Sequence, residues 1–298
     1  MFALIDLLAS VTVSGPVSGT GPLETALGLI FGAIVGFSLG LTGGGGSIFA
    51  VPLLVYGLKV PPQEAVGVSL AAVGTTSLAG FFHRLRGGEV EVSTGLLFAV
   101  AGMLSAPLGT WVGDQIPGAA LLLMFSGLML FVAGRMWRSA TRRPQDASAV
   151  RAGSAPETNE PGPTCQRDPE GKLRWTSRCA GLLVMAGLLT GFLSGLFGVG
   201  GGFVIVPALV FVSGMGIHRA VATSLMVIAL VAASGVASHL VAGGTLPLAL
   251  TGVFVLGGVA GLGLGTALAR RISGPRLQKV FAVAIVAVAV FIVLRNLG

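Results

Sequence analysis

Residues 41–52 read LTGGGGSIFAVP and place a run of four glycines, 43–46, inside a strongly apolar part of the chain. A closely similar stretch, LFGVGGGFVIVP, occupies residues 196–207. Glycine weakens a helix, and inside a bilayer irregular backbone is tolerated only where it is buried in protein or lines a wet cavity. The two stretches therefore predict two breaks in membrane helices, both facing the interior of a helix bundle.

The composition is that of an integral membrane protein. Of the 298 residues, 53% are hydrophobic and only 10% are charged, whereas a soluble domain carries about 25% charged residues. Apolar runs of about 18 residues or more recur, and each is long enough to be a spanning candidate. The net charge of +7 comes from basic residues in short loops and one linker, as membrane topology requires. We therefore expect a lipid bilayer, and no nucleic acid, as a partner.

The glycine runs belong to an internal repeat. When the second half is shifted by 155 residues, which places Gly45 on Gly200, identical residues coincide over a long span. The matched pairs include Gly36/Gly191, Phe37/Phe192, Gly43/Gly198, Pro52/Pro207, Ser69/Ser224 and, after a one-residue gap, His83/His239. Internal repeats in a multi-pass membrane protein are typical of transporters.

Each half contains five apolar segments. They cover residues 22–41, 47–58, 64–82, 93–113 and 118–136 in the first half, and 180–197, 203–213, 219–241, 246–269 and 276–294 in the second. The second segment of each half is too short to span alone, since about 20 residues are needed. The predicted fold is an all-α integral membrane protein of two repeats, 22–136 and 180–295, with helices broken at the glycine loops.

Two further segments complete the organisation. Residues 1–21 are apolar but lack the basic residues with which a signal peptide normally begins, so we expect a short interfacial segment. Residues 137–179 are rich in Pro, Ser, Gly and charge and predict a flexible linker in water. Cys165 and Cys179 lie in or beside this linker, so two unpaired thiols are expected rather than a disulfide framework or a thiolate metal site.

The basic residues indicate whether the repeats are parallel or inverted. Four membrane crossings per half would make the repeats parallel, and an odd number would invert them. With the Arg-rich linker in the cytoplasm, an odd number also places the HRLRGG stretch, 83–88, and the basic residues within 270–279 inside. An inverted repeat is therefore predicted, although it leaves Lys59 and Arg295 outside.

The glycine loops are the predicted substrate site. A broken helix leaves free N–H groups and a positive helix end, which attract an anion without any charged side chain, and successive glycines allow a nest of N–H groups. Two loops related by inversion would meet near the bilayer midplane, where transporter sites usually lie. The predicted substrate-binding residues of the loops are Gly43, Gly44, Gly45, Gly46, Ser47, Gly198, Gly200, Gly201 and Gly202. Glycines at a spacing of four, as in 28–40, instead predict close helix packing.

Hydroxyl and imidazole side chains are further candidates. Ser69, Thr223 and Ser224 lie near the start of the third segments, where a hydroxyl can bind an oxyanion or simply bond to its own helix. His83 and His239 end these segments. Each is either a relay for protons or anions or an interfacial residue at a helix end.

Other chemistry is not expected. No Asp, Glu or Lys lies deep in a predicted span, so the spans lack the carboxylates that usually couple transport to cations or protons. The predicted spans also contain neither a nucleophile with a base nor a cluster of metal ligands. We therefore expect no catalytic residue, no metal and no cofactor.

At the two glycine stretches the sequence resembles a known family. The pair GFSLGLTGGGGSIFAVPLL and GFLSGLFGVGGGFVIVPAL, the VGVSL and VATSL starts of the third segments, and the ends at 83–88 and 239–244 resemble the TauE/SafE family, often called sulfite exporters. The resemblance covers about residues 22–295. It implies a multi-pass transporter in the plasma membrane, which in bacteria is the inner membrane, for sulfur-containing anions such as sulfite or organosulfonates. Related thiosulfate importers use intramembrane cysteines, and this chain has none in its predicted spans.

The resulting hypothesis is a secondary carrier for a small sulfur oxyanion or sulfonate that binds at the glycine loops, with export as the direction that the resemblance implies. One alternative is a carrier or channel for another small anion. A second is a non-transporting membrane scaffold that docks a partner through the linker. A third is a membrane enzyme, although the predicted spans contain neither a nucleophile with a base nor a cluster of metal ligands. The substrate, the coupling ion and the existence of a homo-oligomer stay open.

Overall fold

The computed structural model describes residues 22–142, 177–213, 215–269 and 274–297, and every regular element in these ranges is a helix. Six of the helices are long and apolar enough to cross a membrane. The predicted fold class, an all-α multi-pass membrane protein, is confirmed. The predicted interfacial segment, 1–21, and most of the predicted linker lie outside the described residues.

The helices of the first half follow the predicted apolar segments. They are α2 (Pro22–Thr42), α4 (Pro62–Leu85), α5 (Val92–Gln115) and α6 (Gly118–Arg142). The short second segment is not one regular helix, because it consists of a 3-10 helix η1 (Gly45–Phe49), one turn of α3 (Ala50–Pro52) and a π-helix η2 (Leu53–Gly57). The first glycine run therefore separates α2 from a chain of three short helical turns.

The second half repeats this order with one difference. Its helices are α8 (Ser177–Phe197), α9 (Gly202–Ser213), α10 (Ile217–Val241), α11 (Leu248–Ala269) and α12 (Gly274–Leu297), and here the short second segment, α9, is a regular helix. Both α6 and α8 extend a few residues into the predicted linker. Cys179, buried near the start of α8, is disulfide-bonded. The expectation of two unpaired thiols is therefore wrong, because spacing along the chain does not report proximity in space.

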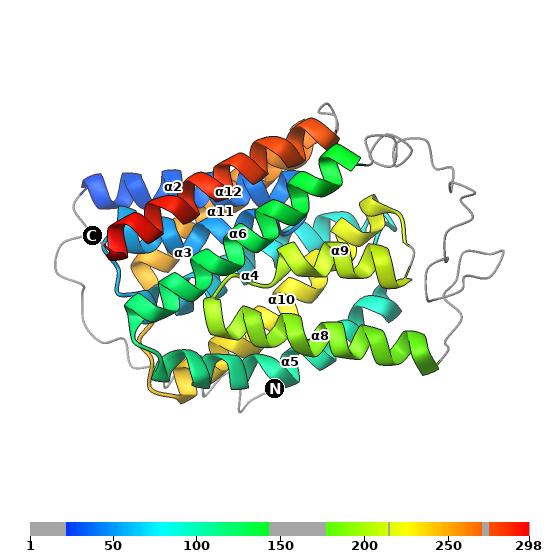
Figure 1. The fold of residues 1–298 in the computed structure, drawn as a ribbon, viewed down its shortest axis with the longest axis horizontal. Coiled ribbons are helices and arrows are strands. Elements are labelled where there is room, and N and C mark those ends of the chain that lie inside the picture. Colours follow the sequence, from blue (N-terminus) through cyan, green and yellow to red (C-terminus); the bar gives the residue numbers. More distant parts are fainter. Residues whose placement is uncertain (1–21, 143–176, 214, 270–273, 298) are drawn as a thin grey trace.

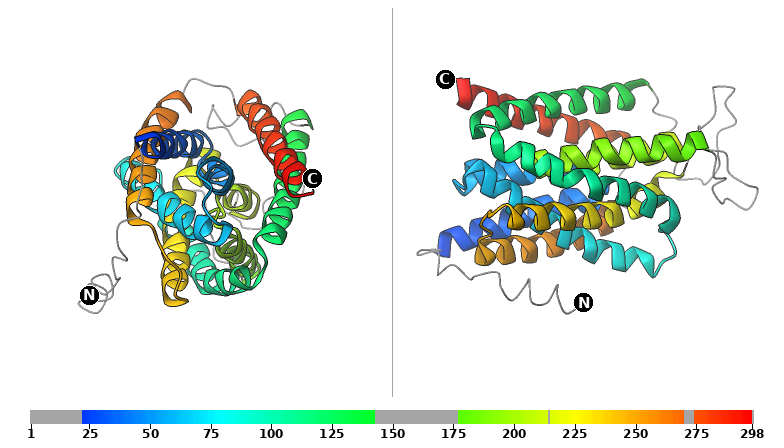
Figure 2. Two further views of the ribbon diagram at one scale, coloured as in Figure 1. Left: turned by 90° about the vertical axis from the view of Figure 1, so that its left-hand side faces the viewer. Right: turned by 90° about the horizontal axis from the view of Figure 1, so that it is seen from below.

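The two halves are interleaved. α2 packs on α11 and α5 packs on α8, so the first helix of each half lies against the fourth helix of the other. The third helices, α4 and α10, pack on each other, as do the fifth helices, α6 and α12. Figure 2 shows α2 beside α11 in both of its views. Neither half therefore forms a separate bundle.

Equivalent helices of the two halves run in opposite directions. In Figure 1, α6 begins at the left and ends at the right, whereas α12 begins at the right and ends at the left. α4 and α10 are antiparallel, since Gly67 contacts His239 at one end of the pair, Gly74 contacts Ala232, and Gly80 contacts Leu225 toward the other end. These directions agree with an odd number of crossings per half, and the inverted repeat stays a prediction that the topology experiment below addresses.

Glycines set the distance between the paired helices. A Cβ on Gly32 would lie 2.2 Å from the carbonyl oxygen of Phe254, and one on Gly36 would lie 1.8 Å from that of Gly258. On the α5–α8 pair, a Cβ on Gly191 would lie 2.2 Å from the carbonyl oxygen of Gly102. Membrane helices associate through such small residues because the lipid provides no hydrophobic driving force between them. The glycines spaced by four therefore act in helix packing, as their spacing predicts.

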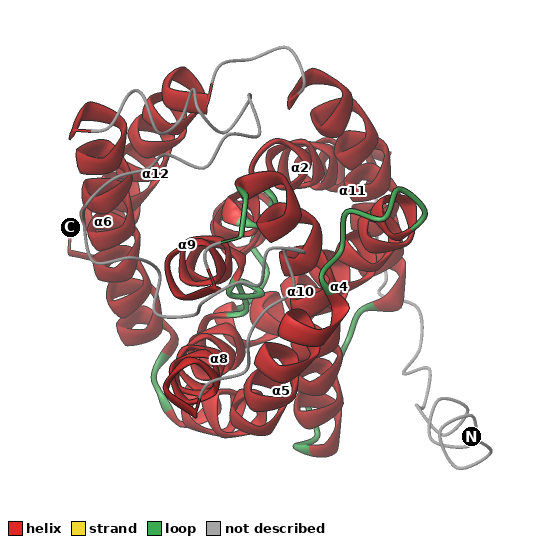
Figure 3. Ribbon diagram, turned by 90° about the vertical axis from the view of Figure 1, so that its right-hand side faces the viewer, coloured by secondary structure: helices red, strands yellow, loops and turns green. Residues whose placement is uncertain are grey.

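The fifth helices form a pair at the side of the bundle. Figure 3 shows α6 and α12 side by side, to one side of the helices that surround α9. Ring contacts join each of them to the rest: Phe125 lies 5.5 Å from Phe197, and Phe281 lies 6.1 Å from Phe49, between ring centroids. The centre of the bundle is consequently formed by α4, α10 and the two glycine loops.

The glycine contacts predict opposite effects for two alanine substitutions. Gly36→Ala places a methyl group into the backbone of α11 and should lower the free energy of unfolding by about 1–3 kcal/mol, the usual cost of overpacking. Gly127→Ala on α6 is the matched control, because a Cβ there meets nothing within 4 Å and alanine is the better helix former. Thermal unfolding in detergent should show a lower Tm for Gly36→Ala only, and equal Tm values would contradict the packing role.

The orientation in the membrane can be tested with fusions. α6 ends and α8 begins at the right of Figure 1, on either side of the linker, whereas α12 ends at the left. Because basic residues favour the cytoplasm, a fluorescent protein inserted at residue 155 should fluoresce, and alkaline phosphatase fused after residue 298 should be active in the periplasm. Disulfides persist on the oxidising side of a membrane, so the disulfide at Cys179 argues for the opposite orientation. An inactive phosphatase fusion and a dark fluorescent protein would contradict the cytoplasmic linker.

Candidate functional site

The first glycine loop has a backbone that only glycine adopts readily. Gly43 has a φ of 74° and Gly44 a φ of 156°, where L side chains are strained. Both the N–H and the hydroxyl of Ser47 donate to the Gly44 carbonyl, at 3.3 and 2.8 Å. These two bonds close the turn from which η1 begins.

The second glycine loop is built in the same way. Gly198, Gly200 and Gly201 have φ values of 69°, 67° and 64°. The N–H groups of Val204 and Ile205 donate to the Gly201 carbonyl at 3.0 and 3.1 Å, which starts α9. The α9 helix therefore points its positive end at the loop.

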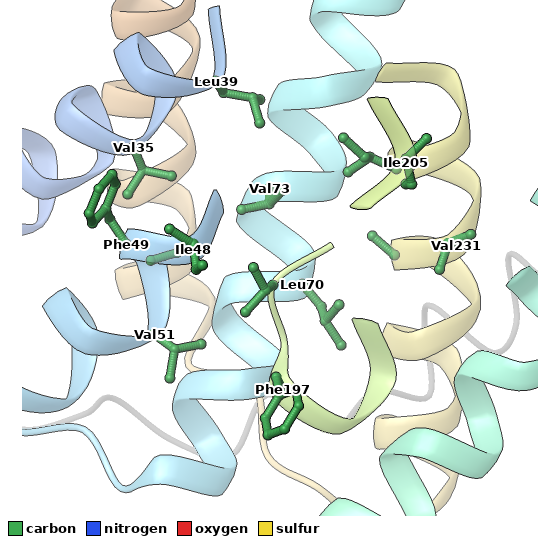
Figure 4. Close-up of a cluster of buried hydrophobic side chains, with 14 of the residues drawn as sticks. Val35, Leu39, Ile48, Phe49, Val51, Leu70, Val73, Phe197, Ile205 and Val231 are labelled. Carbon is green, nitrogen blue, oxygen red and sulfur yellow. The ribbon is translucent and has the colours of Figure 1, made fainter. Parts of the chain in front are cut away.

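The two loops touch each other. A Cβ on Gly44 would lie 2.6 Å from the Cα of Gly202, and one on Gly202 would lie 2.4 Å from the Cα of Gly44. Gly44 and Gly202 are both buried. Figure 4 shows the apolar side chains of this region, among them Val73 of α4 and Ile205 of α9. The sequence-predicted glycines thus form one buried junction, which is closed in this structure.

Two serines hold the loops, each from the opposite half. The Ser69 hydroxyl of α4 donates to the Gly198 carbonyl at 2.6 Å. The Ser224 hydroxyl of α10 lies 2.5 Å from the Gly43 carbonyl and 2.8 Å from the Val221 carbonyl of its own helix, and it shares its one proton between them. A hydroxyl has one proton to donate, so neither serine can donate to an anion in this conformation. The serines predicted to bind substrate here serve as latches for the glycine loops.

The loops offer N–H groups rather than carbonyls. Among the backbone hydrogen bonds that the described residues make outside their helices, none has the N–H of Gly44, Gly45, Gly46, Gly200 or Gly201 as its donor. The carbonyls of Gly43, Gly44, Gly198 and Gly201, in contrast, are all paired. Unpaired backbone donors in a buried nest bind anions. The junction can therefore attract an anion and has little to offer a cation.

The remaining predicted residues lie elsewhere. Thr223 accepts the N–H of Glu91 at 3.0 Å and so contacts the start of α5 rather than the junction. His83 is exposed at the end of α4. His239 is 3% exposed, with neither ring nitrogen paired among the described residues, and it packs against Gly67 and Gly244. It follows Ser224 by 15 residues on α10, which is about 22 Å along a helix.

Sequence reasoning missed two buried hydroxyls. Ser77 of α4 and Ser194 of α8 are 0% and 1% exposed, and their hydroxyls have no partner among the described residues. Ser194 could have been found from its spacing, because it precedes Gly198 by four residues and so by one helical turn. Ser77 shares a helix face with Val73 for the same reason.

A large apolar cavity lies apart from the junction. It has a volume of about 720 Å³ and lies between α2, the η1–η2 segment and α12. Its lining is almost entirely apolar and includes Phe37, Leu41, Phe49 and Phe281. Among the described residues that line it, an anion would find no side-chain donor other than those of Ser38 and Tyr56. The described residues contain no group of three His, Cys, Asp or Glu that could hold a metal ion.

Comparisons with known proteins agree with the architecture. Residues 28–292 match the model of the family described as sulfite exporter TauE/SafE. A "probable membrane transporter protein" of Xylella fastidiosa (strain Temecula1) is 36% identical over 271 residues, which cover 89% of this chain and 93% of the relative. The "probable membrane transporter protein YunE" of Bacillus subtilis is 27% identical over 225 residues, which make up 72% of this chain and 78% of the relative. No solved structure matches.

The latch serines make a prediction about stability. Ser69→Ala and Ser224→Ala each leave a buried glycine carbonyl unpaired, so each should lower the free energy of unfolding by about 1–3 kcal/mol. Along the antiparallel α4–α10 pair the two serines are about 20 Å apart, so the losses should add in the double variant. Ser126→Ala is the control, because the Ser126 hydroxyl bonds only within its own helix, to Leu123. Denaturation in detergent measures all four, and unchanged stability in both latch variants would disprove the role.

Proposed function

This chain belongs to the sulfite exporter TauE/SafE family and is a multi-pass membrane transporter, and we propose that it is a secondary carrier for a small sulfur oxyanion or sulfonate. The observation that supports this proposal is the contact between the two glycine loops at Gly44 and Gly202. Each loop comes from a different half, and each brings N–H groups that donate to no carbonyl among the described backbone bonds outside the helices. The substrate would bind at this junction, near the middle of the bilayer.

Backbone donors suit the transport of an anion across a membrane. A charged side chain in the bilayer centre is costly, whereas N–H groups bind an anion without adding a charge. Hydrogen bonds to a charged group contribute about 1.5–3 kcal/mol each, so a few of them replace much of the water that the anion loses. When the anion leaves, the site returns to neutrality, and no counter-charge hinders the return of the empty carrier.

The closed junction gives a simple account of alternating access. With Gly44 against Gly202 there is no room for an ion between the loops, so binding requires the loops to separate. Separation on one side of the membrane would break one latch, Ser69 with Gly198 or Ser224 with Gly43. The released hydroxyl would then have a proton to donate to the anion, which would bring the predicted serines into the site in the open states.

The placement in the cell is part of the proposal. The family and its bacterial relatives favour the bacterial inner membrane, and the basic residues favour a cytoplasmic 137–179 linker between the two membrane repeats, 22–136 and 180–295. The family description favours sulfite and favours export as the direction.

A carrier or channel for another small anion is the second candidate. Neutral N–H donors recognise charge, size and the positions of oxygens rather than sulfur itself, so a small carboxylate or an inorganic oxyanion fits the same chemistry. Counterflow separates the two mechanisms, because only a carrier accelerates the exchange of labelled substrate when unlabelled substrate is present on the far side.

Sulfite uptake into proteoliposomes tests the proposal. Wild type should show saturable uptake, and Gly44→Ala should lower it by about tenfold or more, because closure of the loops would then cost an overpacking energy of about 1–3 kcal/mol. Gly127→Ala, which meets nothing within 4 Å, should transport like wild type. A pH gradient applied in parallel reports proton coupling.

Two outcomes would count against the proposal. Absence of sulfite and sulfonate uptake by wild type would exclude the sulfur anion and redirect the assay to carboxylates. Equal uptake by wild type and by folded Gly44→Ala would show that the glycine junction only packs the helices.

A further inference from the structure

Two buried hydroxyls lie beside the glycine junction without a hydrogen-bond partner. Within the described residues, three side chains carry buried polar atoms that no partner satisfies: Ser77, Ser194 and His239. The large majority of buried side-chain polar atoms in proteins are paired. Most other buried hydroxyls of this chain follow that rule, as Thr110 and Ser126 do by bonding to their own helices.

Ser194 lies beneath the second loop, on the last turn of α8. Its carbonyl accepts the N–H of Gly198 at 2.9 Å. A Cβ on Gly201 would lie 3.5 Å from the Cβ of Ser194, so the Ser194 side chain packs beside Gly201, whose N–H donates in no described backbone bond outside the helices. In the repeat its equivalent is Leu39, which is 0% exposed. The hydroxyl is therefore a feature of the second half alone, at a place where the first half has a fully apolar side chain.

Ser77 lies on α4 at the level where the loops touch. Through Ser69 and Val73, α4 faces the second loop. Ser77 is one turn beyond Val73 on the same face, since residues four apart share a face of a helix. In the antiparallel register of α4 and α10 it is level with Ile228, which contacts Gly202. The two unpaired hydroxyls thus approach the junction from different halves.

We propose that Ser77 and Ser194 donate hydrogen bonds to the transported anion and complete the set of backbone N–H donors. This inference rests on the proposed function, because it places both residues in the same site. The protons of Ser69 and Ser224 are given to glycine carbonyls, whereas those of Ser77 and Ser194 go to no acceptor among the described residues. A hydroxyl that donates to an anion forms a charge-assisted bond, which is stronger than a bond between neutral groups.

The donor set also specifies the class of anion. Hydroxyl and N–H donors arriving from two helices and two loops converge from several directions, so they fit an anion that has several acceptor oxygens. An oxyanion or a sulfonate satisfies more of these donors than a halide, which has a single centre. The site should therefore prefer sulfite to chloride.

Thermal shift in detergent tests the inference with Ser77→Ala, Ser194→Ala and the control Ser126→Ala. Sulfite should raise the Tm of wild type and of Ser126→Ala, with chloride giving a smaller rise. Each of the first two variants should weaken sulfite binding by about ten- to a hundredfold, the loss expected for one charge-assisted bond. Without sulfite, both should be as stable as wild type or more stable, because an unpaired buried hydroxyl has been removed.

The outcomes separate this inference from the proposed function. If Ser77→Ala and Ser194→Ala keep the sulfite response of wild type, the two serines are not ligands, while the proposed function stands. If both variants lose stability without sulfite and keep its effect, the hydroxyls serve packing, which also overturns the inference. If no oxyanion raises the Tm of wild type and none is transported, the proposed function fails and the inference fails with it.

Discussion

Every backbone polar group inside a bilayer must find its partner within the protein. The two glycine loops meet this requirement for several of their carbonyls but not for most of their N–H groups. Four of their carbonyls are paired, two by serines of the opposite half and two by the turns that follow. The N–H groups of Gly44–Gly46 and of Gly200 and Gly201 donate to no carbonyl among the described backbone bonds outside the helices. We propose that this difference gives the centre of the bundle an affinity for negative charge without a basic side chain. An equally broken helix with free carbonyls would have favoured a cation.

The interleaving of the halves follows from the same constraint. A glycine loop cannot be stabilised by its own half alone, because the serine that holds its carbonyl is on the third helix of the other half. The third helices can reach across only because they pack on each other, with Gly67 and Gly74 of α4 against His239 and Ala232 of α10. The glycine contacts between α2 and α11 and between α5 and α8 bring the backbones of the two halves into contact on both sides of the α4–α10 pair. The contacts that pack the two halves together therefore also set the geometry of the candidate site.

Stability and function compete at the junction. Buried donors without acceptors cost free energy, and so does a backbone held at positive φ. The protein tolerates both at the place where a ligand with several oxygens would satisfy the donors. The carbonyls of Gly43, Gly44, Gly198 and Gly201, which such a ligand could not satisfy, are paired within the protein in this conformation. The cavity beside α12 is lined almost entirely by apolar side chains, with Ser38 and Tyr56 as the only side-chain donors among its described residues, and so suits this purpose less well.

The amino-acid sequence by itself determined the class of the fold, the position of nearly every helix and the two breaks, because hydrophobic length and glycine runs are local properties of the chain. It also identified the glycines of both loops, since their repetition after 155 residues is visible without a structure. Only the tertiary structure decided what the polar side chains do. Ser69 and Ser224 hold glycine carbonyls, and Thr223 contacts the start of α5. His239 is buried against Gly67 of α4, and Ser77 and Ser194 have no partner among the described residues. The physical reason is that a hydroxyl or an imidazole takes its role from the partner that it meets. For these residues the deciding neighbour lies on another element, often in the other half of the chain.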